Sequence, residues 1–169
     1  MLFLIKLLVL AVVIQQSMEQ GNSGIVANIP KKRQKEIIDG HNAVRARVNP
    51  TASNMMKMRW DEEASETAKK WAAQCRGRTS PADQRLVDGV YCGEIMLTSY
   101  KPVSWSKIIE DWSTTSVNFK YGEGPIGDIN LSDVYTQLVW HNSHRVGCAT
   151  AHCPDQIVPF LYVCHYCPL

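Results

Sequence analysis

Cysteine and histidine are the residues of this chain whose chemistry depends most on spacing. The sequence holds six cysteines, an even number that allows three disulfides with the pairing left open. The alternative is a zinc site, because Cys164 and Cys167 have ligand spacing and His152 and His165 lie nearby. A zinc site of this type normally has a second such pair, which is missing here. We therefore expect disulfides among Cys75, Cys92, Cys148, Cys153, Cys164 and Cys167.

Hydrolytic chemistry would need a nucleophile held beside a general base. Ser143 adjoins His144, but neighbours in sequence need not have attack geometry, and no G-x-S-x-G elbow occurs. His141 and His144 form H-x-x-H without the glutamate of the metalloprotease pattern, and no Walker A or dinucleotide fingerprint is present. We expect no enzymatic activity and interpret these histidines as surface residues.

The first twenty residues indicate the compartment. Lys6 precedes an uninterrupted apolar run from Leu7 to Ile14, and polar residues follow, which is the pattern of a secretory signal peptide over residues 1–20. The run is shorter than the ~20 apolar residues that a membrane-spanning helix needs. A signal anchor is the rival interpretation. We expect a secreted, extracellular protein without a membrane span, an oxidising setting that favours disulfides.

Net charge bears on nucleic-acid binding, and one sequon predicts glycosylation. Lys plus Arg is 18 and Asp plus Glu is 16, a formal net charge of +2 that gives no support to nucleic-acid binding. Asn130-Leu131-Ser132 is a glycosylation sequon, whereas Pro50 excludes the sequon-like run that begins at Asn49.

The elements expected to position these residues are helices first and strands last. Residues 21–32 show no periodicity and form a leader. Apolar residues recur at helical spacing over residues 31–48, then after Asp61, then after Ser104. The expected buried stripes are Ile37, Ile38, His41, Val44 and Val48; Ala64, Ala68, Trp71 and Cys75; and Trp105, Ile108, Ile109 and Trp112.

The C-terminal segments predict a sheet. Residues 146–153 and 159–167 are rich in β-formers and alternate in polarity, so we expect two antiparallel strands joined by a loop with Pro154 and Asp155. Helices packed on this sheet give an α+β fold in one domain over residues 33–169.

Several separated segments resemble one family. The runs VYTQLVWHNSHRVGCA and LYVCHYCPL resemble the two signature segments of the CAP superfamily, and HNAVRARVNPTASNMMKMRWDEEA and CGEIMLTSY are most similar to vertebrate cysteine-rich secretory proteins. The resemblance covers about residues 33–168. It implies an α-β-α sandwich with a central antiparallel sheet between helical layers. It also implies the disulfides Cys75–Cys153, Cys92–Cys167 and Cys148–Cys164, which tie the second helix and a central strand to the C-terminal hairpin.

Full-length members of that family continue into a second cysteine-rich domain associated with ion-channel regulation. This sequence ends at Leu169, so the resemblance implies a truncated member without that domain, as in the amphibian egg-jelly sperm attractants. Channel regulation is not carried over.

The family cleft usually holds two histidines and two acids that coordinate a divalent cation such as zinc. By resemblance His41 and Glu94 match one histidine and one acid, whereas Thr115 and Val134 replace the other two. Zinc needs three or four ligands, so no cofactor is expected. The preferred interpretation of His41 and Glu94 is a buried hydrogen-bonded pair.

The resemblance therefore points to binding. We expect an extracellular ligand in reproduction, acting through a cell-surface receptor on sperm in binding, guidance or maturation. An alternative is carriage of a sterol or fatty acid under a lip formed by residues 119–131, and a defence or venom role is a third interpretation. Trp105, Phe119, Tyr121 and Trp140 are aromatic anchors for a partner, although each fits the core better.

Overall fold

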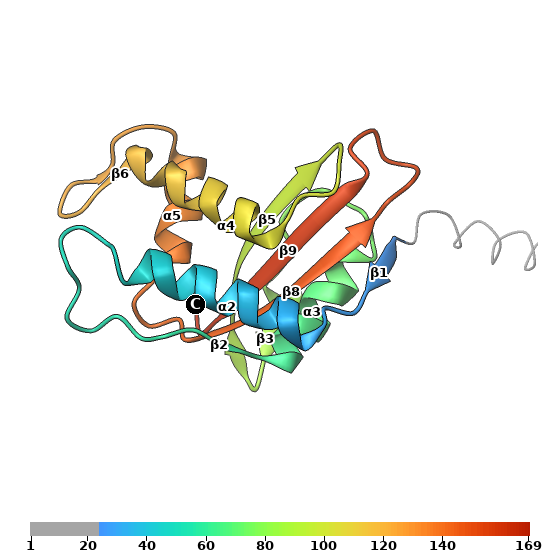
Figure 1. Ribbon diagram of the computed structural model, residues 1–169, viewed down its shortest axis with the longest axis horizontal. Helices are drawn as coiled ribbons and strands as arrows, with labels where there is room; N and C mark the ends of the chain where they lie inside the picture. Colours follow the sequence, from blue (N-terminus) through green and yellow to red (C-terminus); the bar gives the residue numbers. More distant parts are fainter. Residues whose placement is uncertain (1–23) are drawn as a thin grey trace, which may run out of the picture.

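The computed structural model describes residues 24–169, and a central sheet organises them (Figure 1). Its strands run in the order β1 (Ile25–Ala27), β8 (Arg145–His152), β9 (Phe160–Cys167) and β5 (Gly93–Ser99), each antiparallel to its neighbour. The short strand β2 (Arg59–Trp60) adds a parallel pairing to β8. The predicted antiparallel pair at the C-terminus is confirmed as β8 and β9. The strand of the CGEIMLTSY segment, β5, lies at the end of the order rather than in its centre.

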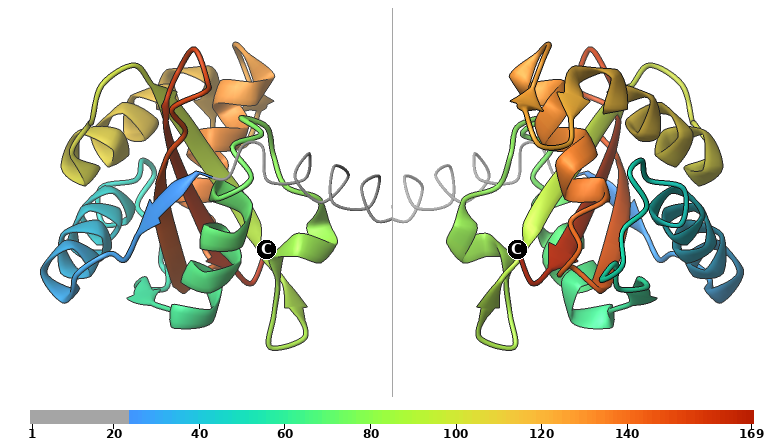
Figure 2. Two further views of the ribbon diagram at one scale, coloured as in Figure 1. Left: turned by 90° about the vertical axis from the view of Figure 1, so that its right-hand side faces the viewer. Right: turned by 90° about the vertical axis from the view of Figure 1, so that its left-hand side faces the viewer.

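Helices cover both faces of this sheet (Figure 2). Helices α2 (Lys31–Arg45), α4 (Trp105–Thr114) and α5 (Ile129–Leu138) pack on one face, where they share a core with Ile95, Val146 and Tyr166. Helix α3 (Glu62–Ala72) packs on the other face against Ala149 and Val163. The α-β-α sandwich is confirmed, because successive strand residues alternate between these two cores.

Short elements connect the layers. Between α3 and β5 lie the 3-10 turn η1 (Ala82–Arg85) and the hairpin β3 (Leu86–Val87) and β4 (Val90–Tyr91). Between α4 and α5 lie the turn η2 (Thr115–Asn118) and the hairpin β6 (Phe119–Lys120) and β7 (Gly124–Pro125).

Two of the expected helices begin at side-chain caps. The Asp61 carboxylate accepts the Ala64 amide at the start of α3, and the Ser104 hydroxyl accepts the Lys107 amide at the start of α4. The predicted stripe of α4 is confirmed, since all four of its apolar members are buried. Cys75 was expected on the α3 stripe, but the helix ends at Ala72 and Cys75 follows it with φ 53°.

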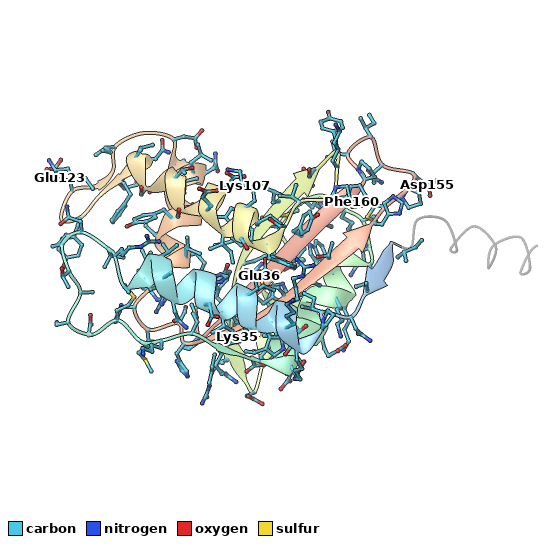
Figure 3. All side chains as sticks on the ribbon, viewed as in Figure 1. Lys35, Glu36, Lys107, Glu123, Asp155 and Phe160 are labelled. Carbon is cyan, nitrogen blue, oxygen red and sulfur yellow. A yellow bond between two sulfur atoms is a disulfide. The ribbon has the colours of Figure 1, made fainter. Side chains whose placement is uncertain are left out.

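Helix α2 differs from its prediction. It ends at Arg45 instead of continuing to residue 48, and its buried residues are Gln34, Ile37, His41 and Arg45. Two polar side chains thus occupy the buried stripe in place of Ile38 and Val44, because each donates hydrogen bonds to backbone carbonyls. The opposite face of the helix is solvated at Lys35, which lies on the outside (Figure 3) and pairs with Asp39. Glu36 is half-buried and accepts the amide and hydroxyl of Ser106 in α4.

The expected leader is also partly structured. Residues Ile25–Ala27 form β1 and pair with His152, Ala151 and Thr150 of β8. This pairing uses backbone groups of a distant strand, so the local sequence carries no pattern that reports it.

Three disulfides are present: Cys75–Cys153 ties the end of α3 to the end of β8, Cys92–Cys167 ties the start of β5 to the end of β9, and Cys148–Cys164 joins the paired strands β8 and β9. This is the pairing that the family resemblance implied. It excludes the zinc alternative at Cys164 and Cys167, since both sulfurs are in disulfide bonds. In the described part of the chain, no helix is both long and apolar enough to cross a membrane. The expected signal peptide lies outside the described residues.

Candidate binding groove

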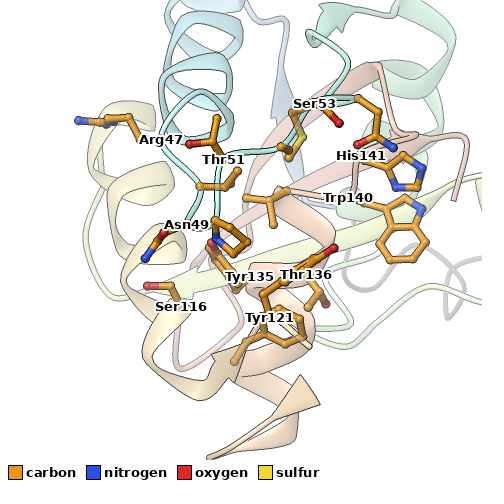
Figure 4. A pocket seen from close by; sticks show the side chains of 17 residues that line it. Arg47, Asn49, Thr51, Ser53, Ser116, Tyr121, Tyr135, Thr136, Trp140 and His141 are labelled. Atoms are coloured by element: carbon orange, nitrogen blue, oxygen red, sulfur yellow. The ribbon is translucent and has the colours of Figure 1, made fainter. Parts of the chain in front are cut away.

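A groove of about 680 Å³ lies at one end of the sandwich (Figure 4). One wall is the loop that follows α2, residues 47–55. The other wall comes from Ser116, Phe119 and Tyr121 after α4, and from the C-terminal half of α5 through His141. Segments far apart in sequence therefore meet here, although none of them contains a catalytic motif.

Aromatic rings form much of the groove. Phe119 and Tyr135 pack against each other with ring centroids 6.0 Å apart. Tyr121 and Trp140 also line the groove, with 72% and 46% of their surfaces exposed. Sequence reasoning favoured a core position for these two residues, which is wrong, whereas Trp105 is buried as a core residue beside Tyr162. Exposed aromatic rings at the rim of a hollow are typical contact residues.

Polar side chains supply much of the remaining lining. Ten of the 17 lining residues carry amide, hydroxyl, imidazole or guanidinium groups, the two tyrosines among them, and none of the 17 carries a carboxylate. Figure 4 shows Arg47 at one end of the groove and Trp140 with His141 at the other. The groove is thus elongated, chemically mixed and without negative side chains.

A buried arginine holds the two walls together. Arg45 is only 2% exposed, and six hydrogen bonds from its guanidinium reach five backbone carbonyls at 2.7–3.4 Å. One carbonyl, Met56, belongs to the loop after α2. The others lie between α5 and β8: Leu138, Trp140, His141 and Ser143.

No carboxylate of the described residues pairs with Arg45, so its charge is satisfied by carbonyl dipoles alone. Burial lowers its pKa to about 10, which still leaves the guanidinium protonated at neutral pH. The Asn42 side chain adds two bonds to the backbone of Met58. Together these contacts fix both ends of the groove before any ligand arrives.

A second polar network lies on the α3 face of the sheet. The Glu94 carboxylate accepts the Ser80 amide at 2.9 Å and the Ser80 hydroxyl at 2.6 Å, and it lies 3.0 Å from His165 Nε2. His165 Nδ1 lies 2.8 Å from the Thr67 hydroxyl. Burial would raise the pKa of Glu94, but the hydrogen bonds from His165 and Ser80 outweigh it and hold the pKa below its usual value.

This network has the order of a hydroxyl–imidazole–carboxylate triad, and sequence reasoning missed it. His165 is fully buried and the Glu94 side chain is 1% exposed, so a substrate cannot reach the imidazole. The arrangement stabilises the contact between α3, β5 and β9 rather than presenting a nucleophile.

His41 lies on the opposite face of the sheet. Its Nδ1 lies 2.8 Å from the Ile37 carbonyl and must therefore carry the proton, which leaves Nε2 to accept the Tyr166 hydroxyl at 2.9 Å. Burial lowers the pKa of His41 to about 4. The hydrogen bond to the Ile37 carbonyl opposes this shift, and the nearby Arg45 cation adds to it. The expected His41–Glu94 hydrogen bond is wrong, because each residue has other partners and the sheet separates them.

Comparison with known proteins decides the family. The profile of the CAP, cysteine-rich secretory protein family matches residues 38–166, which is most of the chain. The chain belongs to this family.

Solved structures agree with that membership at the level of the CAP fold. The venom allergen-like protein 4 of Schistosoma mansoni is 22% identical over 82% of this chain and 90% of its own, with a TM-score of 0.67. NaASP2, solved with Zn²⁺, is 24% identical over 83% of this chain and 81% of its own, with a TM-score of 0.65. A hookworm platelet inhibitor is 19% identical over 85% of this chain and 72% of its own, with a TM-score of 0.62.

The cation associated with CAP domains does not fit the residues matched to its ligands here. Both ring nitrogens of His41 and both carboxylate oxygens of Glu94 are already hydrogen-bonded. The Thr115 hydroxyl donates to the Trp112 carbonyl, and Val134 packs its hydrocarbon side chain against the core. Between residues 24 and 169, no three His, Cys, Asp or Glu side chains gather as a metal site.

Ser143 and His144 of this CAP domain do not form a nucleophile–base pair either. The Ser143 hydroxyl donates to the Pro168 carbonyl and is buried, whereas His144 Nδ1 lies 3.1 Å from the Asn142 carbonyl. The groove is therefore the feature of the domain most suited to an external partner. The aromatic residues at positions 119, 121, 135 and 140 were the only signal of it in the sequence.

Proposed function

We propose that this CAP domain is a secreted, non-enzymatic extracellular ligand that acts in reproduction by binding the surface of sperm. The observation that carries the proposal is the preorganised groove: the buried Arg45 holds the Trp140 backbone in place, and Trp140 and Tyr121 expose their rings at the rim. A rigid surface with exposed aromatic anchors loses little entropy when it binds, which favours recognition.

Family membership and the disulfides support an extracellular site of action. The reproductive role rests on the similarity of HNAVRARVNPTASNMMKMRW and CGEIMLTSY to vertebrate cysteine-rich secretory proteins. The absence of enzymatic activity is part of the proposal, and the buried position of His165 and Glu94 favours it.

The proposal is tested with fluorescently labelled, disulfide-bonded protein on live sperm. We expect saturable surface binding that unlabelled protein displaces, and a loss of at least about tenfold in affinity for Trp140→Ala. The matched control is Tyr100→Ala, which removes an aromatic ring that is 70% exposed and does not line the groove. Absence of saturable binding to sperm, together with unchanged motility and swimming direction, would overturn the reproductive role.

A second candidate function is carriage of a sterol or fatty acid. Phe119 and Tyr121 of the expected lip do line the groove, which is the observation in its favour. We rank it second because more than half of the lining residues carry polar groups and the aromatic rim faces solvent. Titration with cholesterol and palmitate checks it, since saturable uptake of either would move carriage to first place. A defence role is compatible with the same fold and is examined by growth inhibition of microbes.

A further inference from the structure

We propose that the groove binds an acidic saccharide, an oligosaccharide that carries a carboxylate or sulfate group. The inference rests on the proposed function and deepens it, because it names the chemical class of the cell-surface partner. Three features of the groove carry it: exposed rings, polar groups that the fold does not use, and the absence of negative charge.

The rings suit sugar faces. A pyranose presents a flat patch of C–H groups that packs on an aromatic ring, and Tyr or Trp can then bond with its own polar atom. Tyr121 and Trp140 offer such rings to solvent, and Phe119 and Tyr135, whose rings pack against each other, also line the groove. An apolar chain would instead need an enclosed pocket that removes most of its surface from water.

The polar side chains of the loop wall have no structural task. Asn49, Thr51, Ser53 and Asn54 make no side-chain hydrogen bond to another described residue, although other polar side chains near the groove, such as Asn42 and Arg45, are fully engaged. Figure 4 shows Asn49, Thr51 and Ser53 arranged along this wall. Amide and hydroxyl groups in a row match the alternating donors and acceptors of sugar hydroxyls.

Charge selects the acidic class. Arg47 is the only lysine or arginine in the lining, and no carboxylate opposes it. Its Nε donates to the Ala43 carbonyl, which orients the guanidinium and leaves its terminal nitrogens unpaired among the described residues. A guanidinium binds carboxylate and sulfate through two parallel hydrogen bonds. A cationic group would meet the Arg47 guanidinium at this end of the groove and would find no carboxylate in the lining.

Saturation-transfer NMR and calorimetry with three probes test the inference: lactose, sialyllactose and sulfated lactose. The protein carries Ser132→Ala so that its own sequon does not compete. We expect sialyllactose or sulfated lactose to bind at least about tenfold more tightly than lactose, and the preferred probe identifies the acidic group. Arg47→Gln should remove this preference, and Tyr121→Ala should weaken binding of every probe at least about tenfold.

Tyr100→Ala is again the matched control and should bind like the parent protein. Binding of none of the three probes, or binding that Tyr121→Ala and Arg47→Gln leave unchanged, would overturn the inference. So would saturable cholesterol or palmitate binding that the sugars do not displace. Tyr121 is largely exposed, so its variant is expected to fold normally, which far-UV circular dichroism checks.

The sperm assay separates this inference from the proposed function. Sperm binding that neuraminidase, sulfatase and Arg47→Gln all leave intact would retain the function and refute the saccharide. Saccharide binding in solution without binding to sperm would retain the groove assignment and refute the reproductive role.

Discussion

Replacing Arg45 by methionine should destabilise the protein and loosen the groove. The substitution keeps a long side chain in the buried space but removes all six hydrogen bonds to backbone carbonyls. Two of the acceptors, the carbonyls of Leu138 and Ser143, are bonded in fully buried positions, whereas the others can reach water. An unpaired buried acceptor costs about 1–3 kcal/mol, so we expect a loss of about 4 kcal/mol.

That loss is a large share of the stability of a domain, which is typically about 5–15 kcal/mol. Arg45→Lys should lose about 2 kcal/mol, because an ammonium keeps the charge but has three donors on one nitrogen and cannot span five carbonyls. Urea unfolding at pH 7, followed by tryptophan fluorescence with the disulfides intact, measures both values. Hydrogen exchange should also quicken at the Met56 amide, which bonds across the groove to the His141 carbonyl.

The control is Arg47→Met, two residues further along the same segment. Arg47 is exposed and makes one side-chain bond, so its loss should change stability by no more than about 0.5 kcal/mol. If Arg45→Met cost less than about 1 kcal/mol, or no more than Arg47→Met, the view that this arginine holds the groove together would be refuted.

Three further predictions address other parts of the domain. The free energy of unfolding should fall by about 3 kcal/mol as the pH falls from 6.5 to about 4. In this window His41 becomes protonated in the unfolded state, whereas the buried imidazole of the folded state stays neutral. Urea midpoints at successive pH values, compared with those of His41→Asn, isolate the contribution of His41. Ser132→Ala should abolish a glycan at the exposed Asn130 without loss of stability, since the buried Ser132 hydroxyl has no partner among residues 24–169; mass spectrometry and thermal unfolding check both. Gly147→Ala should lower stability by more than about 3 kcal/mol, because a Cβ would lie 2.0 Å from the backbone of α3.

Each of these predictions has a result that contradicts it. An unchanged pH profile in His41→Asn would mean that another group causes acid destabilisation, and the half-buried His144, replaced in the same way, is the control. A thermal midpoint lowered by Ser132→Ala would show that the hydroxyl has a partner in solution. Normal stability of Gly147→Ala would mean that α3 can move away from the sheet.

The local pattern of the sequence was sufficient for several elements. The four apolar residues of α4 follow helical spacing, and Ser104 caps the first turn, so both the helix and its buried face follow from neighbours within one or two turns. The two C-terminal strands are rich in β-formers over their whole length and could be paired for the same reason. The even cysteine number predicted disulfides but not which cysteines pair.

Two buried positions of α2 were not predicted, because their residues are polar. Gln34 and Arg45 occupy the same helical stripe as Ile37 and His41, and spacing alone would have placed them there. Apart from His41, buried positions were assigned to apolar residues, which excluded Gln34 and Arg45. The carbonyls that satisfy these two lie in other segments: Ile29 for Gln34, and residues 56 and 138–143 for Arg45.

What the sequence determined by itself was the α+β class and the buried stripe of α4, both properties of neighbouring residues. The tertiary structure decided the separation of His41 from Glu94, the pairing of Glu94 with His165, and the groove between the α2 loop and α5. Strand register and chain path set these contacts. A one-residue change of position along a strand moves a side chain to the other face of the sheet, so no local pattern reports which distant residues will meet.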